Sequence, residues 1–281
     1  DPIIPSYYDL TNTNNNWQDL IYQKAPQTGV NVSTSGGSEK GTYYLGIGYL
    51  NQEGIIVGSN FKRYSIKLSV EQNATDWLKL GANFNYNRTY QRTVTDNASA
   101  NFGGVVISAL VTPEYIPVKM PAGAPVPGVY GVSNFYSGEN PLSNIYNNTN
   151  KTIGNNLLGN VFTEIKLPFA IKYRSQFNAS VGNSKYDWFQ DPYSSLTGIS
   201  AGGAARSNYS EVFRWAWDNT LSYSKIIGLH SIDVVAGTSA LNEKIETSGQ
   251  YGTGFATNAV QTLNGASGNF QVGTARYEWS T

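Results

Sequence analysis

The chain has 281 residues and a mass of 30.6 kDa, enough for one large domain or two ordinary ones. Charged residues make up only 14% of it, and its formal net charge is zero with no basic stripe, which argues against a nucleic-acid partner. Cysteine is absent, which excludes disulfides and thiolate metal sites.

The sequence opens with DPIIPSYYDL, which has no basic segment followed by an apolar run. No stretch of the chain approaches 18 continuous apolar residues. We therefore expect neither a signal peptide nor a transmembrane helix in this chain. Period-2 alternation recurs along the sequence and helical spacing is scarce, so the predicted fold class is all-β.

The first two strands are predicted near residues 29–36 and 43–50. In the second, one face carries Tyr43, Leu45, Ile47 and Tyr49, whereas the other carries Gly46 and Gly48. An ordinary solvent-facing sheet would place charged side chains on that second face. The bare face suits a crowded or plugged lumen in which bulky side chains do not fit.

Seven more strands are predicted in chain order, at residues 64–71, 78–86, 156–166, 169–181, 213–223, 232–236 and 271–279. Most of them place apolar residues on one face and polar residues on the other, and residues 169–181 do so most clearly. Aromatic residues near strand ends suit the girdles of a membrane interface, although aromatic residues are also ordinary strand formers. These residues are Tyr49, Trp77, Tyr86, Tyr173 and Trp215.

The gaps between the predicted strands alternate between short and long. The short gaps are GGSE, QNATD, LP and KIIGL. The longer gaps are NQEGIIVGSN and residues 89–155, 183–210 and about 242–270. Bacterial outer-membrane barrels have this organisation, with short periplasmic turns and long external loops. We therefore predict an antiparallel up-and-down transmembrane β-barrel segment, about nine strands of a larger barrel.

Several stretches resemble one known family. Between Trp17 and Tyr86 they are WQD, an AP run into NVSTSGGSEK, GYLNQEGII, FKRY and WLKLGAN. Later stretches are ENPLSNIY, LLGNVFTEIKL and WDNTLSYSKIIGLHSIDVVAGTSA. They closely resemble the SusC/RagA family of TonB-linked outer-membrane transporters, and residues 89–135 and 183–210 match least.

The resemblance implies a large plugged barrel in the outer membrane of a Gram-negative bacterium of the Bacteroidetes type. Such a barrel imports oligosaccharides or peptides with energy from the TonB–ExbB–ExbD complex, and a SusD-like surface lipoprotein closes over it. It implies contact with outer-membrane lipid and no catalysis or cofactor. Residues 1–281 are expected to be a partial barrel domain without the plug, the TonB box or the C-terminal strands, so TonB would act through N-terminal regions outside this chain.

The chemistry-bearing residues do not predict an enzyme or a metal site. His230 is the only histidine and is expected to flank a turn, since one imidazole without Cys or a second His makes a poor metal site. Carboxylates are scattered singly, whereas a hydrolase would need a pair or a nucleophile with its base. We expect no catalytic residue.

Two predicted external loops contain candidate ligand contacts. Trp188 and Phe189 lie between Asp187 and Asp191, which suits sugar recognition by stacking and hydrogen bonding. The Pro- and Gly-rich run 120–141 offers three aromatic residues, Tyr130, Phe135 and Tyr136. Simple loop solvation or packing is the alternative for both groups.

Two other functions remain open from the sequence. A secreted or surface all-β glycan-binding domain would need a second sheet to cover Leu78, Leu80 and Phe84. A passive porin would conduct without TonB, whereas a plugged importer would not.

Overall fold

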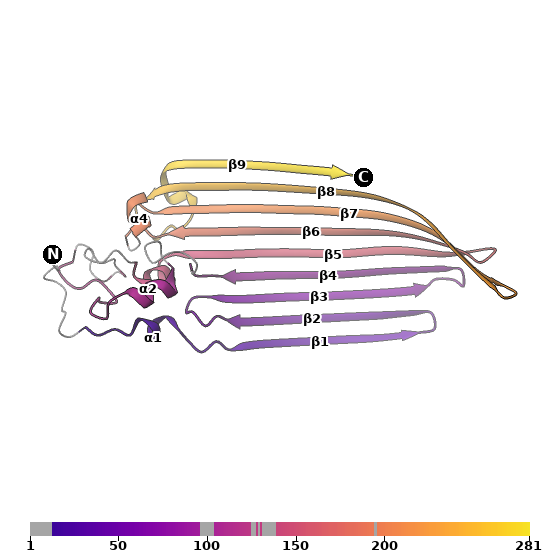
Figure 1. The fold of residues 1–281 in the computed structure, drawn as a ribbon, viewed down its shortest axis with the longest axis horizontal. Coiled ribbons are helices and arrows are strands. Elements are labelled where there is room, and N and C mark those ends of the chain that lie inside the picture. The colour runs from indigo at the N-terminus through magenta and orange to yellow at the C-terminus, as the bar shows by residue number, and fades with distance from the viewer. Residues whose placement is uncertain (1–12, 96–103, 125–127, 129, 131–138, 194–195) are drawn as a thin grey trace.

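The computed structural model describes residues 13–95, 104–124, 128, 130, 139–193 and 196–281. Nine strands form one antiparallel sheet in chain order, with β1 and β9 at its edges (Figure 1). The strands are β1 (Gln27–Ser38), β2 (Gly41–Glu53), β3 (Asn60–Asn73), β4 (Leu78–Arg92), β5 (Thr149–Leu167), β6 (Ile171–Gln190), β7 (Ala204–Ile227), β8 (His230–Phe255) and β9 (Ala266–Ser280). The prediction of an all-β up-and-down barrel segment is confirmed.

The connections follow the predicted alternation. Tight turns join β1 to β2, β3 to β4, β5 to β6 and β7 to β8, and they lie together at what we call the tight-turn end. The longer connections lie at the opposite loop end, where their described parts are residues 54–59, 93–95, 104–124, 128, 130, 139–148, 191–193, 196–203 and 256–265 (Figure 1). Each strand therefore runs once between the tight-turn end and the loop end.

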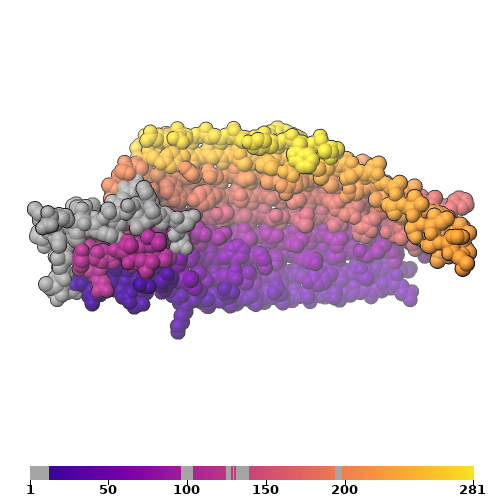
Figure 2. All heavy atoms as spheres, in the orientation of Figure 1, coloured from indigo at the N-terminus to yellow at the C-terminus, as the bar shows by residue number. Residues whose placement is uncertain are grey.

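The tight-turn end is stepped. Ile171, the first residue of β6, pairs with Tyr223, and β7 continues beyond that pair to Ile227. Figure 2 shows the β7–β8 hairpin, in orange, projecting beyond the turns of β1–β4. Such a stagger between neighbouring strands is what closing tilted strands into a barrel requires.

Several strands are longer than the sequence predicted. β6 continues to Gln190 and β7 begins at Ala204, so Asp187, Trp188 and Phe189 lie on a strand and not in an external loop. The prediction was wrong because the polar residues there look like a loop but form polar contacts within β6 and with β7. Ser207 donates a hydrogen bond to Asp187 (2.8 Å), and Lys185 pairs with the same carboxylate at 3.1 Å.

Short helices, which the sequence pattern did not predict, gather at the loop end. They are α1 (Trp17–Ile21), α2 (Val105–Val111), α3 (Pro141–Tyr146), α4 (Leu196–Ala201) and the 3-10 helix η2 (Leu263–Gly265). Helices of five to seven residues show too few turns for a periodic signal. None of the helices among the described residues is long and apolar enough to cross a membrane.

Helices α1, α2 and α3 share a small apolar core, which we call the helical cluster. Its buried residues are Trp17, Ile21, Val105, Ala109, Ile116, Leu142 and Ile145. The indole Nε1 of Trp17 donates to the Pro113 carbonyl (3.0 Å), which ties α1 to the segment between β4 and β5. Asn140 caps α3 by accepting from the backbone N–H of Leu142 (2.9 Å).

The strand register gives the sheet two unlike faces. On one face, Ile47 pairs with Val32 and Ile66, and this pattern continues across the sheet. This apolar face also carries Val30, Tyr43, Leu45, Tyr49, Leu68, Val70, Leu80, Phe84, Leu157, Val161, Phe177, Val181, Phe213, Trp217, Leu221 and Val234. The opposite polar face carries mainly Asn, Ser, Thr and charged residues.

Glycines occur on the polar face where neighbouring side chains fold across the sheet. A Cβ atom at Gly46 would lie 2.7 Å from the Tyr44 hydroxyl, and one at Gly48 would lie 2.6 Å from Asn31 Oδ1. A Cβ atom at Gly81 would lie 2.2 Å from the ring of Phe162. These glycines therefore provide the space that larger neighbours occupy.

Gly81→Ala is expected to lower the free energy of unfolding by about 1–3 kcal/mol, because the new methyl group displaces the buried Phe162 ring. Urea unfolding of the intact protein in lipid vesicles measures the change. Gly273→Ala is the matched control, since a methyl group there would meet nothing within 4 Å. Equal effects of the two substitutions would contradict this account, and Phe162→Leu should partly rescue Gly81→Ala.

Candidate functional site

The apolar face carries a continuous band. In β6 it runs from Ile171 to Val181, about 33 Å along the strand and about 25 Å in height at a tilt of about 40°. Ser175 is a polar residue within it, and its hydroxyl accepts a hydrogen bond from Trp217 Nε1 (2.9 Å). A height of about 25 Å is that of the lipid-facing band in outer-membrane barrels.

Aromatic rings border this band toward the loop end. The ring centres of Tyr49 and Tyr64 are 5.1 Å apart, and those of Tyr64 and Tyr90 are 6.1 Å apart in an edge-to-face arrangement. Charged residues lie beside and beyond these rings on the same face, including Arg88 next to Tyr64 and Lys62 next to Tyr90. The change from apolar to aromatic to charged residues marks one border of the band.

Hydrogen bonds join side chains of the polar face across several strands. Ser69 donates to Asn83 (2.5 Å), and Asn83 donates to Asn160 (3.1 Å). Farther along the sheet, Asn178 and Ser239 donate to Asp218 at 3.0 and 2.6 Å. We call these hydrogen-bonded side chains the polar belt. Through it, many polar side chains have hydrogen-bond partners within the sheet itself.

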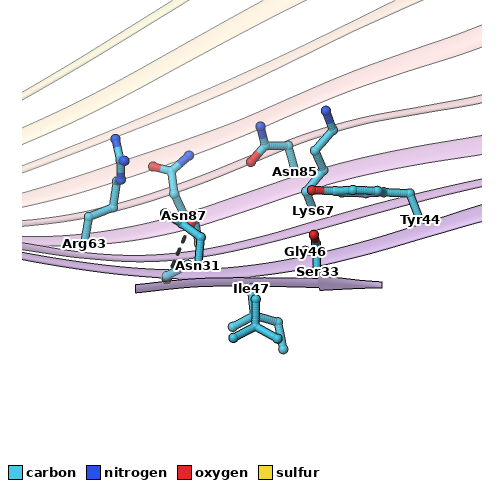
Figure 3. A pocket seen from close by; sticks show the side chains of 12 residues that line it. Asn31, Ser33, Tyr44, Gly46, Ile47, Arg63, Lys67, Asn85 and Asn87 are labelled. Carbon is cyan, nitrogen blue, oxygen red and sulfur yellow. Dashed lines mark hydrogen bonds between the residues drawn. The ribbon is translucent and has the colours of Figure 1, made fainter. Parts of the chain in front are cut away.

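A hollow of about 400 Å³ lies on the polar face over β1–β4. Figure 3 shows Asn31, Arg63, Lys67 and Asn87 on one side of the sheet, whereas Ile47 points to the other. Most of the side chains around the hollow can donate or accept hydrogen bonds. It is therefore suited to water and polar groups rather than to lipid.

Most carboxylates of the polar face near the tight-turn end pair with cations. Glu71 pairs with Lys79 at 2.7 Å, and Glu164 pairs with both Lys172 and Arg174 at 3.6 Å. Arg174 also stacks 4.0 Å from the ring centre of Phe162. These ion pairs keep the charged side chains close to the polar face of the sheet.

The predicted ligand contacts in the run 120–141 are only partly described. Tyr130 stacks on Tyr146 with ring centres 5.2 Å apart and planes at 19°, and Lys119 Nζ lies 5.1 Å from the Tyr130 ring. Tyr146 is more than half exposed. Phe135 and Tyr136 lie outside the described residues.

The structure separates the three predicted contacts of β6. Trp188 points to the polar face, where it pairs in register with Asn150 and Arg206. Asp187 lies on the opposite face with Ser207, and Phe189 is fully buried with its ring centre 5.1 Å from that of Phe255. Of the three, only Trp188 presents its ring toward the polar face.

Trp188 belongs to a loop-end aromatic cluster that the sequence analysis did not identify as a group. Its members are Tyr186, Trp188, Arg206 and Tyr251. Trp188 and Tyr251 both pair in register with Arg206, whose guanidinium lies 5.5 Å from the Tyr251 ring centre. Flat rings beside a guanidinium can stack on sugars or peptide side chains and bind polar groups.

His230 is exposed and begins β8 beside the tight turn, as the sequence predicted. Among the residues that the structure describes, no three His, Asp or Glu side chains form a metal-binding group.

Similarity to known sequences agrees with the barrel-segment fold. TonB-dependent receptor P26 of Formosa agariphila is 29% identical over 249 residues, which cover 85% of this chain and 23% of the receptor. TonB-dependent receptor SusC of Bacteroides thetaiotaomicron is 25% identical over 250 residues, covering 82% of this chain and 24% of SusC. The chain spans about a quarter of the length of these relatives. No family model matches it.

Solved structures share the fold. A structure of the RagAB peptide transporter has a TM-score of 0.75 at 22% identity and covers all of this chain and 32% of its own. The RagAB peptide importer in its open-open state gives 0.75 at 23% identity, with 100% and 31% covered. The predicted resemblance to SusC/RagA-type TonB-dependent receptors is confirmed.

These likenesses confirm the predicted location in the outer membrane of a Gram-negative bacterium. The relatives are transport proteins rather than enzymes, in agreement with the prediction of no catalysis. In such a barrel the apolar face contacts lipid and the polar face lines the interior.

Leu68→Arg, in the middle of the band on β3, is expected to lower the free energy of unfolding by about 2–4 kcal/mol because it places a charge in lipid. The control Asn156→Arg adds the same charge on the polar face of β5, opposite Asn87 and Gly182, and should change that energy by less than about 0.5 kcal/mol. Urea titration in vesicles compares them. A larger effect at Asn156 would reverse the assignment of the two faces.

Proposed function

We propose that this chain forms part of the barrel wall of a TonB-dependent importer that takes up oligosaccharides or peptides. One observation carries the proposal: a sheet with an apolar band on one face and a polar wall on the other is similar over most of its length to TonB-dependent receptors. The apolar band contacts the lipid, and the polar face lines the interior through which the substrate passes.

The proposed importer works with other proteins. A SusD-like surface lipoprotein would cover the loop end, and the TonB–ExbB–ExbD complex would supply energy through regions outside this chain. The names of the RagAB structures favour a peptide for those proteins, and the glycan alternative stays in the proposal for this one.

The loop end offers two surfaces for substrate contact. One is the loop-end aromatic cluster with Trp188, and the other is the Tyr130–Tyr146 stack beside Lys119. Phe135 and Tyr136 stay in the proposal on the sequence alone. Asp187 and Phe189 are no longer proposed as ligand contacts. Asp187 lies on the apolar face, where Ser207 donates a hydrogen bond to it, and Phe189 is buried.

The alternative of a secreted glycan-binding domain lacks support among the described residues. Such a domain would cover the apolar face with a second sheet, whereas the described strands form one sheet whose apolar face is widely exposed. Leu45, Ile47, Leu68 and Val161 on that face are each 36% exposed or more.

The first test is a gel of outer-membrane protein from the source bacterium, probed with an antibody to residues 139–148. We expect a boiled band several times larger than 30.6 kDa that migrates faster when unboiled, as stable barrels do. Deleting the gene or inactivating TonB should then stop uptake of the same oligosaccharide or peptide. A band near 30.6 kDa outside the membrane fraction would refute the proposal, and uptake without TonB would favour the porin.

Trp188→Ala in the intact importer should weaken substrate binding roughly 2- to 10-fold, the value of one lost aromatic contact. Isothermal titration with the imported substrate measures it. Trp77→Ala is the matched control, because Trp77 is half exposed in the turn at the other end of the sheet. Unchanged binding by Trp188→Ala would remove the loop-end aromatic cluster from the proposal without touching the import function.

A further inference from the structure

Two cations and two tyrosines form a compact unit on the apolar face, just beyond the band toward the loop end. Lys62 of β3 pairs in register with Tyr90 of β4, and Tyr64 pairs with Arg88. The guanidinium carbon of Arg88 lies 4.9 Å from the Tyr90 ring centre. We call Lys62, Tyr64, Arg88 and Tyr90 the cationic unit.

The height of the cationic unit is set by the strand. Lys62 is the next residue on this face after Tyr64, about 7 Å farther along β3. Tyr64 borders the band, with Ile66, Leu68 and Val70 following toward the tight-turn end. The two cations therefore lie at the level of the lipid headgroups on the loop side of the membrane.

Neither cation has a carboxylate partner in the part of the chain that the structure describes. Arg88 Nε is buried and has no hydrogen-bond partner. Farther out on the same face, Arg92 donates a hydrogen bond to the Ile145 carbonyl (2.8 Å), and Lys151 of β5 pairs in register with Arg92 on one side and with Asp187 on the other. The positive charge without a carboxylate partner on this face therefore lies on β3 and β4, at Lys62 and Arg88.

The other half of the sheet differs at the corresponding level. Lys185 pairs with Asp187 at 3.1 Å, Lys244 with Glu246 at 2.9 Å and Arg276 with Glu278 at 2.6 Å. Cations on this face of β6, β8 and β9 are therefore neutralised within the protein. Lys62 and Arg88 have no such partner within the described residues.

We propose that the cationic unit binds a phosphate group of the glycolipid in the outer leaflet, the lipopolysaccharide that faces the loop side of the membrane. The proposal rests on the proposed function only for the membrane location. Arg88 and Lys62 supply N–H donors and charge to the phosphate, while the tyrosine rings lie against the sugar and the upper acyl chains. A lipopolysaccharide molecule is thereby held at a fixed position on the lipid-facing side of β3 and β4.

The test uses the intact outer-membrane protein, stripped of lipid by detergent exchange and returned to neutral micelles. Native mass spectrometry then measures binding of phosphorylated lipid A and of the same lipid with its phosphates removed. We expect the wild-type protein to prefer the phosphorylated lipid, and the double variant Lys62→Gln/Arg88→Gln to bind it about 30-fold less tightly, which equals about 2 kcal/mol.

The double variant Arg63→Gln/Lys67→Gln is the matched control, because it removes the same charge from the polar face of β3. It should retain the preference for phosphate, and raising the salt concentration should reduce that preference in the wild type. Faster migration of every variant when unboiled verifies folding. Equal binding of both lipids by the wild type, or equal loss in both double variants, would overturn the proposal. Neither result bears on import, which the uptake assay tests separately.

Discussion

The cross-strand register is the constraint on which the rest of this structure depends. Every strand pairs antiparallel with its sequence neighbours, and the ladder is unbroken from β1 to β8. A strand exposes alternate residues on opposite faces, so slipping by one residue would exchange its apolar and polar side chains. The lipid-facing band, the polar belt and the cationic unit therefore exist together only in one register.

The strand pattern could be predicted because alternation is a local property of the sequence. Residues 169–181 carry it over many positions, and β6 contains nearly all of them. The ends of the strands could not be placed in this way. Beyond the band the apolar face of β6 becomes charged, at Lys185 and Asp187, and the polar face carries Tyr186 and Trp188, so the alternation disappears although the hydrogen-bonded ladder continues. The predicted loop at 183–210 contained strand residues for that reason.

The recognition surfaces were harder to predict, because their members come from different strands. Trp188 was identified from its own neighbourhood, but its partners Arg206 and Tyr251 are contributed by β7 and β8 and are brought together only by register. Phe189 looked equally suitable and is buried under Phe255. The cationic unit was missed for a similar reason: net charge over the whole chain is zero, and the imbalance appears only on one face of β3 and β4.

The helical cluster has a consequence for the order of folding. Tight turns join half of the neighbouring strand pairs, and the connection between β4 and β5, residues 93–148, is by far the longest of the others, so this pairing has the largest entropic cost. Helices α2 and α3 lie in that segment and pack on α1, which precedes β1, so the helical cluster holds the start of β5 near the first four strands. The sheet can thus assemble as two separate groups of strands, β1–β4 and β5–β9, which the helical cluster then joins. Destabilising the helical cluster, for example by a substitution at Trp17, would slow the pairing of β4 with β5 while leaving each group of strands able to form by itself.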